Sequence, residues 1–135
     1  MAIVNLVTTI AIVDDTPDHS KMLAVLLKEA GYRTVTFSGG EEFLENFRRG
    51  AYDLILLDIR MPDIDGYALF DTVRETDREV PIIAVTGKAY EEDGRRIMSH
   101  GFSAIVTKPI IDMKAFLRVL ASQLVAAKRR PPTSR

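Results

Sequence analysis

The chain has no cysteine, no basic signal-like start and no apolar run long enough to cross a membrane. Without cysteine, disulfide bridges and thiolate metal sites are excluded. Residues 1–7 are mostly apolar, but they are too few to span a bilayer and lack the features of a signal peptide. We interpret them as a lead-in to a strand, and we expect a cytoplasmic protein that does not bind membranes.

Length and composition are those of one globular domain. The 135 residues are 47% hydrophobic and 27% charged, and a chain of this length folds without covalent staples. The formal net charge is −1, yet the last eight residues carry four positive charges. We expect a domain at 1–127 and, at 128–135, a frayed basic tail or the start of a linker. Four charges are too few to indicate a nucleic-acid partner, and no DNA-binding module is expected after residue 127.

Strand-like and helix-like segments alternate along the chain. Apolar runs predict strands at residues 8–13, 33–37, 53–57, 80–85 and 103–107. Amphipathic stretches predict helices at residues 17–30, 38–50, 67–75, 89–100 and 112–127. Five βα units with apolar strands indicate an α/β fold whose parallel sheet is covered by helices on both faces.

Three helix starts carry capping signals. Thr16 precedes Pro17, which suits an N-cap followed by the first helical position. Ser38 and Glu41 have the spacing of a capping box, and Asp112 is an N-cap candidate for the last helix. These residues fix where the first, second and fifth helices should begin.

Acidic and basic side chains follow three of the predicted strands. Asp14 and Asp15 follow the first strand, Asp58 the third and Lys108 the fifth. Because the carboxyl ends of parallel strands meet at one edge of a sheet, these side chains should meet there. Converging carboxylates repel one another unless a cation is present, and their oxygens suit Mg²⁺. Taken alone, the first two acids also fit a helix start, where negative charge favours the dipole.

The residues at this edge of the sheet indicate chemistry on a phosphoryl group. An aspartate beside a magnesium ion can act as a nucleophile toward a phosphoryl group. The ammonium of Lys108 suits a phosphate or a carboxylate awaiting one. Thr86 ends the fourth strand, where its hydroxyl could donate to a phosphoryl oxygen or simply form a turn.

Four motifs in order resemble the receiver domain of two-component response regulators. They are Val13-Asp14-Asp15, Leu57-Asp58-Ile59-Arg60-Met61-Pro62-Asp63-Ile64-Asp65-Gly66, Val85-Thr86-Gly87 and Thr107-Lys108-Pro109. The resemblance covers about residues 6 to 127. It implies a CheY-like (βα)5 fold, a flavodoxin-like three-layer sandwich with sheet order 2-1-3-4-5.

The resemblance also implies a phosphorylated switch rather than an enzyme acting on substrates. Asp58 would accept a phosphoryl group from a histidine kinase, a histidine phosphotransfer protein or a small phosphodonor. Lys108 and Thr86 would hold the phosphoryl oxygens. The domain would catalyse only its own phosphorylation and dephosphorylation, and it would signal to a downstream protein through helix 4, strand 5 and helix 5.

The same resemblance implies a set of magnesium ligands. Asp15, Asp58 and the backbone carbonyl of Arg60 would bind Mg²⁺ directly, and Asp14 would act mainly through a metal-bound water. The spacing alone does not distinguish the roles of Asp14 and Asp15.

Three positions depart from the family pattern. Ile105 stands where receivers usually carry an aromatic residue whose ring rotates on activation, so readout through that ring is in doubt. Instead of ring rotation, the chain could signal through motion of the fourth helix, which Gly94 interrupts, or could serve mainly as a phosphate carrier. Arg60 and Lys88 lie two residues after Asp58 and Thr86, and our hypothesis is that they shield the acyl phosphate from water; both could equally be solvated basic side chains.

Two histidines and a docking face complete the sequence predictions. His19 and His100 are interpreted as surface residues, the first near the crevice and the second suited to a helix C-terminus. The face that docks a phosphotransfer partner is expected to include Thr16, Pro17, Met22, Met61, Pro62 and Pro109.

Three other functions are weaker. A haloacid-type aspartyl-phosphate hydrolase needs a second aspartate two residues after the nucleophile, where this chain has Arg60. A degenerate receiver would have lost an acid or the lysine, and this chain keeps them. A nucleotide-binding fold would carry G-x-G-x-x-G after its first strand, which is absent here.

Overall fold

The computed structural model describes residues 7–87 and 91–129 as ten alternating elements. The strands are β1 (Thr9–Val13), β2 (Arg33–Phe37), β3 (Leu54–Asp58), β4 (Ile82–Thr86) and β5 (Ala104–Thr107). The helices are α1 (Pro17–Glu29), α2 (Gly40–Asn46), α3 (Gly66–Thr76), α4 (Glu91–His100) and α5 (Met113–Arg129). None of the helices within these two ranges is long and apolar enough to cross a bilayer.

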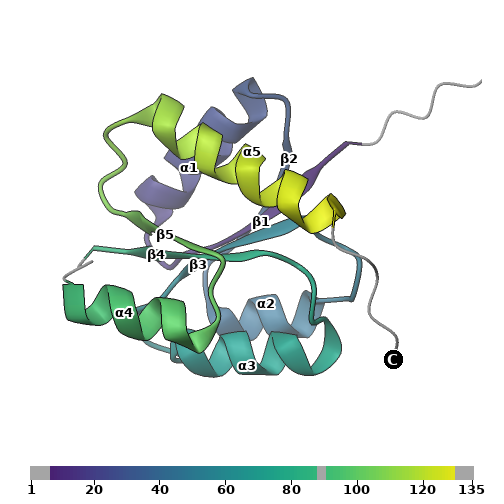
Figure 1. The fold of residues 1–135 in the computed structure, drawn as a ribbon, viewed down its shortest axis with the longest axis vertical. Coiled ribbons are helices and arrows are strands. Elements are labelled where there is room, and N and C mark those ends of the chain that lie inside the picture. Colours follow the sequence, from purple (N-terminus) through teal and green to yellow (C-terminus); the bar gives the residue numbers. More distant parts are fainter. Residues whose placement is uncertain (1–6, 88–90, 130–135) are drawn as a thin grey trace, which may run out of the picture.

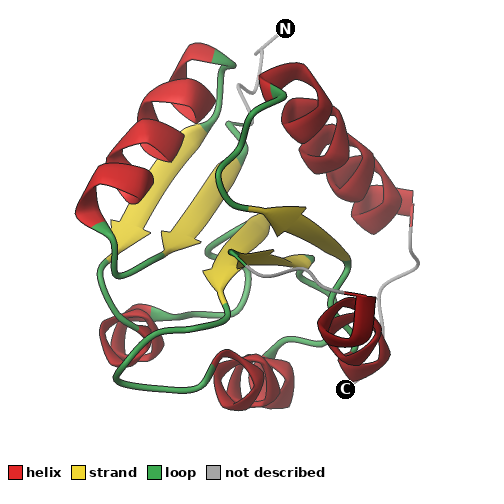
Figure 2. Cartoon of the chain, turned by 90° about the vertical axis from the view of Figure 1, so that its left-hand side faces the viewer, coloured by secondary structure: helices red, strands yellow, loops and turns green. Residues whose placement is uncertain are grey.

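All five strands form one parallel sheet in the order β2-β1-β3-β4-β5. Helices α1 and α5 cover one face, and α2, α3 and α4 cover the other (Figure 1). Figure 2 shows the strands enclosed by helices on both sides. The expected three-layer α/β fold with order 2-1-3-4-5 is confirmed.

The core has two halves because strand residues alternate between the two faces of the sheet. Every residue of β3 is buried. Its Ile55 and Leu57 face α2, α3 and α4, where they join Phe43, and its Leu54 and Leu56 face α1 and α5. Apolar contact on both faces fixes the register of the central strands, and therefore where each strand ends.

Register aligns the strand ends that carry the polar residues. Val13 is paired with Leu57, and Asp58 is paired with Val85. Thr86 is paired with Thr107, one residue before Lys108. The residues that follow β1, β3, β4 and β5 therefore emerge at one edge of the sheet.

Two of the three capping predictions place the helix start correctly. Thr16 is the N-cap of α1 with Pro17 next to it, although its side chain makes no capping hydrogen bond. The carboxylate of Asp112 accepts a hydrogen bond from the backbone N–H of Ala115 at 2.9 Å, as an N-cap should.

The predicted Ser38–Glu41 capping box is wrong. Gly39 is the N-cap of α2, and it is Glu42 that accepts a hydrogen bond from the backbone N–H of Ser38, at 2.9 Å. The N–H of Glu41 donates instead to Asp63, at 2.9 Å, in the loop between β3 and α3. The helix start is therefore capped by a carboxylate that is distant in sequence.

Several predicted boundaries shift. Helix α2 ends at Asn46 rather than at Gly50, since Phe47 adopts extended backbone and packs against the core. Helix α4 continues through Gly94, and α5 reaches Arg129. Some predictions fall outside the described residues. They are the strand lead-in before residue 7, Lys88, the start of the fourth helix at residue 89, and residues 130–135 of the tail.

Gly66 and Gly94 should respond to alanine in opposite directions. A Cβ atom on Gly66 would lie 2.7 Å from the Cα of Ile59, a backbone atom that cannot move aside easily. We expect Gly66→Ala to lower the free energy of unfolding by about 1–3 kcal/mol through overpacking. Gly94→Ala should raise it by roughly 0.5–1 kcal/mol, because alanine favours a helix interior and, within the described part of the chain, its Cβ meets only Ile105, at 3.8 Å. Urea unfolding followed by circular dichroism measures both, and equal stabilities would contradict this packing.

Candidate functional site

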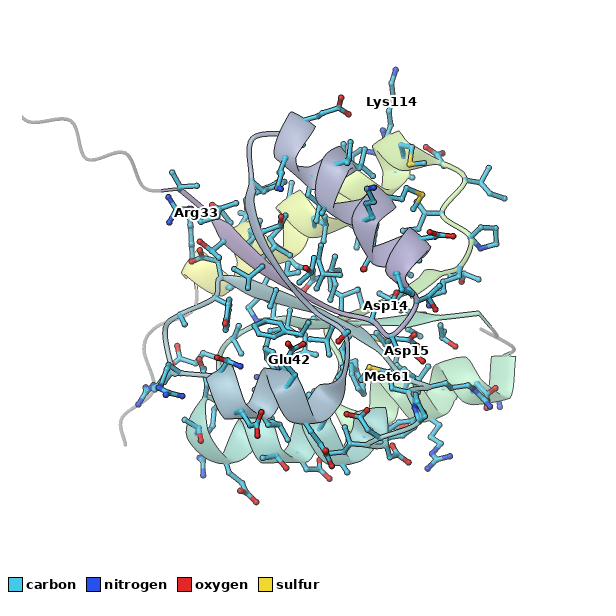
Figure 3. The ribbon with its side chains drawn as sticks, turned by 180° about the vertical axis from the view of Figure 1, so that it is seen from behind. Asp14, Asp15, Arg33, Glu42, Met61 and Lys114 are labelled. Atoms are coloured by element: carbon cyan, nitrogen blue, oxygen red, sulfur yellow. The ribbon has the colours of Figure 1, made fainter. Side chains whose placement is uncertain are left out.

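The polar residues singled out in the sequence lie together at the carboxyl edge of the sheet. Asp14 follows β1, Asp58 is the last residue of β3, and Lys108 follows β5. Figure 3 shows Asp14 and Asp15 close to Met61, which lies in the loop after β3. The predicted convergence of remote charged side chains is therefore present.

Three carboxylates form a compact group. One oxygen from each of Asp14, Asp15 and Asp58 lies within 4.8 Å of the other two. Asp14 and Asp58 are only 3% and 5% exposed, whereas Asp15 is half-buried. Hard oxygen donors in partial contact with solvent are the ligands that Mg²⁺ prefers, since it keeps several of its waters. The residues present fit a magnesium ion.

Lys108 bridges two of these acids. Its Nζ lies 3.0 Å from Oδ2 of Asp58 and 3.3 Å from Oδ2 of Asp14. Its backbone N–H donates to the carbonyl of Thr86 at 2.8 Å, and the Lys108–Pro109 peptide bond is cis. Burial lowers the pKa of Lys108, but its hydrogen bond to Asp58 and the nearby negative charges outweigh burial and raise it. The ammonium therefore stays charged.

The two buried carboxyls titrate in opposite directions. Burial raises the pKa of Asp58, and the hydrogen bonds from Lys108 and from the N–H of Arg60, at 3.0 Å, do not cancel it. Burial also acts on Asp14, but the N–H of Thr16, at 2.8 Å, together with His19 and Lys108, lowers the pKa of Asp14 below its ordinary value. The pKa of Asp14 therefore lies below the ordinary aspartate value and the pKa of Asp58 lies above it.

A cavity of about 210 Å³ lies beside the first residues that follow Asp58, Ile59 and Arg60. Thr86, which is 3% exposed, contributes to its wall. The other described residues of the wall are Ile59, Arg60, Asp65, Tyr67, Asp93, Arg96 and Ile97. Thr86 and α4, which supplies three of these residues, therefore face the same cavity.

Arg60 and Ile105, two of the three residues that depart from the family pattern, do not share one environment. The guanidinium of Arg60 is 66% exposed and lies 3.9 Å from the carboxylate of Asp93 in α4. Ile105 is not among the described residues that line the Thr86 cavity; it is half-buried and lines a shallow depression beside α5. Lys88 lies outside the described residues.

The prediction that His19 is a surface residue is wrong, whereas His100, for which the same was predicted, is partly exposed. His19 is 13% exposed, and its Nδ1 lies 2.6 Å from Oδ2 of Asp14. It belongs to the site because the first turn of α1, which begins at Pro17, lies against the acid group. The start of that helix was readable from the sequence, but the direction of the side chain was not.

His100 is held in a contact between helices. Its Nε2 lies 2.8 Å from Oδ1 of Asp71 in α3, and the side chain is 28% exposed. The rings of Tyr67, Phe70 and Phe102 surround it, with centroids 4.9, 5.1 and 6.1 Å away. This cluster joins the end of α4 to α3.

The predicted docking face is only partly exposed. Thr16, Pro17, Pro62 and Pro109 are exposed and Met22 is half-buried. Met61 is 8% exposed, and including it was wrong, because its side chain joins the core below the loop.

Comparison with known proteins identifies the family. The sequence profile of the response regulator receiver domain matches residues 10–120. The chain belongs to the response regulator receiver family. This receiver domain is 33% identical over 118 residues to the polar-differentiation response regulator DivK of Brucella anthropi, covering 86% of this chain and 95% of DivK.

A sensor kinase contains a similar segment. The receiver domain is 33% identical over 101 residues to the sensor histidine kinase RcsC of Salmonella typhimurium, which is 75% of this chain and 11% of RcsC. The chain therefore spans about a tenth of the length of that relative.

Solved receiver structures share the fold. The receiver domain of the sensor histidine kinase PA1611 from Pseudomonas aeruginosa, which has a magnesium ion in its active-site cleft, superposes with a TM-score of 0.79 at 29% identity, covering 89% of this chain and 99% of that one. TrrA from Thermotoga maritima, in complex with Mg²⁺ and a beryllium fluoride, gives a TM-score of 0.76 at 31% identity, covering 86% and 98%. The receiver domain is a signalling domain of two-component systems, not a hydrolase acting on substrates.

Removing each buried acid of the receiver domain should change the pH dependence of stability in an opposite sense. The raised pKa of Asp58 stabilises the fold below the ordinary aspartate value of about 3.9, and this contribution is lost as the pH rises. Asp58→Asn should therefore gain stability relative to wild type as the pH increases. The lowered pKa of Asp14 stabilises the fold above that value, so Asp14→Asn should lose stability at neutral pH and recover toward wild type in acid. Urea unfolding in chelator across pH 3–7 tests both, and parallel profiles would exclude the assignment.

Proposed function

We propose that Asp58 accepts a phosphoryl group from a histidine kinase or a histidine phosphotransfer protein in a Mg²⁺-dependent reaction. The observation that carries the proposal is the Lys108 ammonium, 3.0 Å from Oδ2 of Asp58, beside three gathered carboxylates. A positive charge and a place for a divalent cation flank the one carboxylate that ends a central strand. The cytoplasmic location and the domain boundary at residue 127 stay predictions.

The transfer forms one bond and breaks another. A carboxylate oxygen of Asp58 attacks the phosphorus of the donor phosphohistidine, and the P–N bond breaks with its electron pair going to the imidazole nitrogen. Lys108 then donates to a phosphoryl oxygen, and the hydroxyl of Thr86 donates to another. Mg²⁺, held by Asp15, Asp58 and the backbone carbonyl of Arg60 with Asp14 acting through water, would neutralise charge on the phosphoryl oxygens.

The signal would pass through Thr86 to α4. Phosphorylation adds negative charge and acceptor oxygens at Asp58. The Thr86 hydroxyl is drawn toward them, and because it forms a wall of the cavity beside α4, the packing of α4, β5 and α5 shifts with it. A two-state equilibrium with a gap of a few kcal/mol is sufficient for such a switch.

Phosphate shuttling is the second candidate. Ile105 is aliphatic and lies outside the wall of the Thr86 cavity, so a rotating aromatic at this position is not available to transmit a signal. A receiver that only relays phosphate between proteins needs the Asp58 chemistry but no change in α4. Amide hydrogen exchange of α4 with and without a phosphoryl analogue distinguishes the two functions.

Incubation with Mg²⁺ and acetyl phosphate should add the mass of one phosphoryl group to the wild-type chain. Asp58→Ala should remove that gain, and Asp53→Ala, at the opposite end of β3, is the matched control that should keep it. Chelation of Mg²⁺ should abolish the gain in wild type, because the repulsion among the three carboxylates is then not offset. Intact-mass measurement reads all four samples, and phosphorylation of the Asp58→Ala chain would refute the assignment.

Arg60→Asn should shorten the lifetime of the phosphorylated form. An exposed arginine beside the acyl phosphate contributes about 0.5–1 kcal/mol, so we expect decay about two- to fivefold faster. Arg118→Asn, an exposed arginine on α5, is the control. Loss of mass over time measures the decay, and an unchanged lifetime would leave Arg60 as a solvated side chain.

A further inference from the structure

Both oxygens of Asp14 are engaged by the protein itself. Oδ1 accepts a hydrogen bond from the backbone N–H of Thr16 at 2.8 Å. Oδ2 is approached by Nδ1 of His19 at 2.6 Å and by Nζ of Lys108 at 3.3 Å. Because an ionised carboxylate only accepts hydrogen bonds, Nδ1 of His19 is the donor. The orientation of Asp14 is therefore set by three groups, of which two are side chains.

Packing alone does not explain the imidazole of His19. The side chain is 13% exposed, and its Nε2 is buried without a hydrogen-bond partner among the described residues. A buried polar atom without a partner is unfavourable, and an apolar side chain would avoid it. Among the described residues, the hydrogen bond that the ring makes is the one to Asp14, so the polar role of the imidazole lies there.

His19 also affects where Lys108 lies. The two donors share Oδ2 of Asp14, and His19 is the closer by distance. Lys108 lies nearer to Asp58, at 3.0 Å, than to Asp14, at 3.3 Å. Without the imidazole, Oδ2 of Asp14 would be free to draw the flexible ammonium away from Asp58.

We propose that His19 is a positioning residue that fixes the Asp14 carboxylate for the magnesium site and keeps Lys108 on Asp58. The inference rests on the proposed function, because it assigns His19 a role in the same Mg²⁺-dependent site. The candidate metal ligands are the three carboxylates of Asp14, Asp15 and Asp58. His19 is not one of them, so it acts through Asp14. Groups that orient a metal-binding side chain in this way affect metal affinity without touching the ion.

Three substitutions of His19 separate the effect of the hydrogen-bond donor from the effect of side-chain size. In asparagine the amide nitrogen is as many bonds from the backbone as Nδ1 of histidine, so His19→Asn keeps the donor in place. His19→Leu has similar size and no donor, and His19→Gln carries the same amide one bond further out. His100→Leu is the matched control, because His100 is also a partly buried histidine that contacts an aspartate, at 2.8 Å, but away from the site.

Mg²⁺ affinity measured by titration calorimetry at one pH is the readout, with urea unfolding in chelator as a check on folding. We expect His19→Leu and His19→Gln to bind Mg²⁺ about tenfold more weakly, the low end for groups that orient a ligand. His19→Asn and His100→Leu should stay within about twofold of wild type. If His19→Leu does not fold, His19→Gln provides the comparison.

The outcomes distinguish the two proposals. Absence of Mg²⁺ binding by the wild-type chain would defeat the proposed function itself. Normal binding by wild type and by the donor-displacing variants would overturn only the role of His19. Weak binding by His19→Asn, equal to that of His19→Leu, would also overturn it, because the donor would then not be what matters.

Discussion

Repulsion among three carboxylates is the constraint on which the functional edge of this domain depends. Asp14, Asp15 and Asp58 place oxygens within 4.8 Å of one another, and two of these side chains are almost fully buried. Lys108 offsets part of that repulsion by contacting two of the acids at once. The remaining negative charge suits the edge to a divalent cation. The pKa of Asp58 is raised mainly by burial, and the charge of Asp14 adds a smaller contribution in the same direction.

The packing of the sheet holds the three carboxylates close together despite their repulsion. The central strands are apolar on both faces, so a slip of one residue would expose buried side chains on either side. The strand ends are consequently fixed to within a residue, and so are the charged groups that follow them. The energy that holds like charges together comes from burial of aliphatic side chains in the two halves of the core.

Sequence reasoning predicted what depends on strand ends and missed what depends on contacts between distant elements. Asp14, Asp58 and Lys108 were predictable because each follows an apolar run, and parallel strands end at one edge. The cap of α2 was not, because Asp63, which accepts from the N–H of Glu41, lies 22 residues further along the chain. His19 was missed for a related reason: its position in the first turn of α1 was readable, but the neighbour of its side chain was not.

The cluster around His100 joins the end of α4 to α3. His100, the last residue of α4, contacts Asp71. Arg96, one turn earlier, lies over Tyr67 with its guanidinium carbon 4.3 Å from the ring centroid. Gly101 follows with a φ of 120°, a conformation that suits glycine. One end of the helix is thus anchored to α3, so any displacement has its fulcrum there and grows toward the other end. If phosphorylation displaces α4 as proposed, the displacement at its first residues would therefore be larger than the displacement at His100.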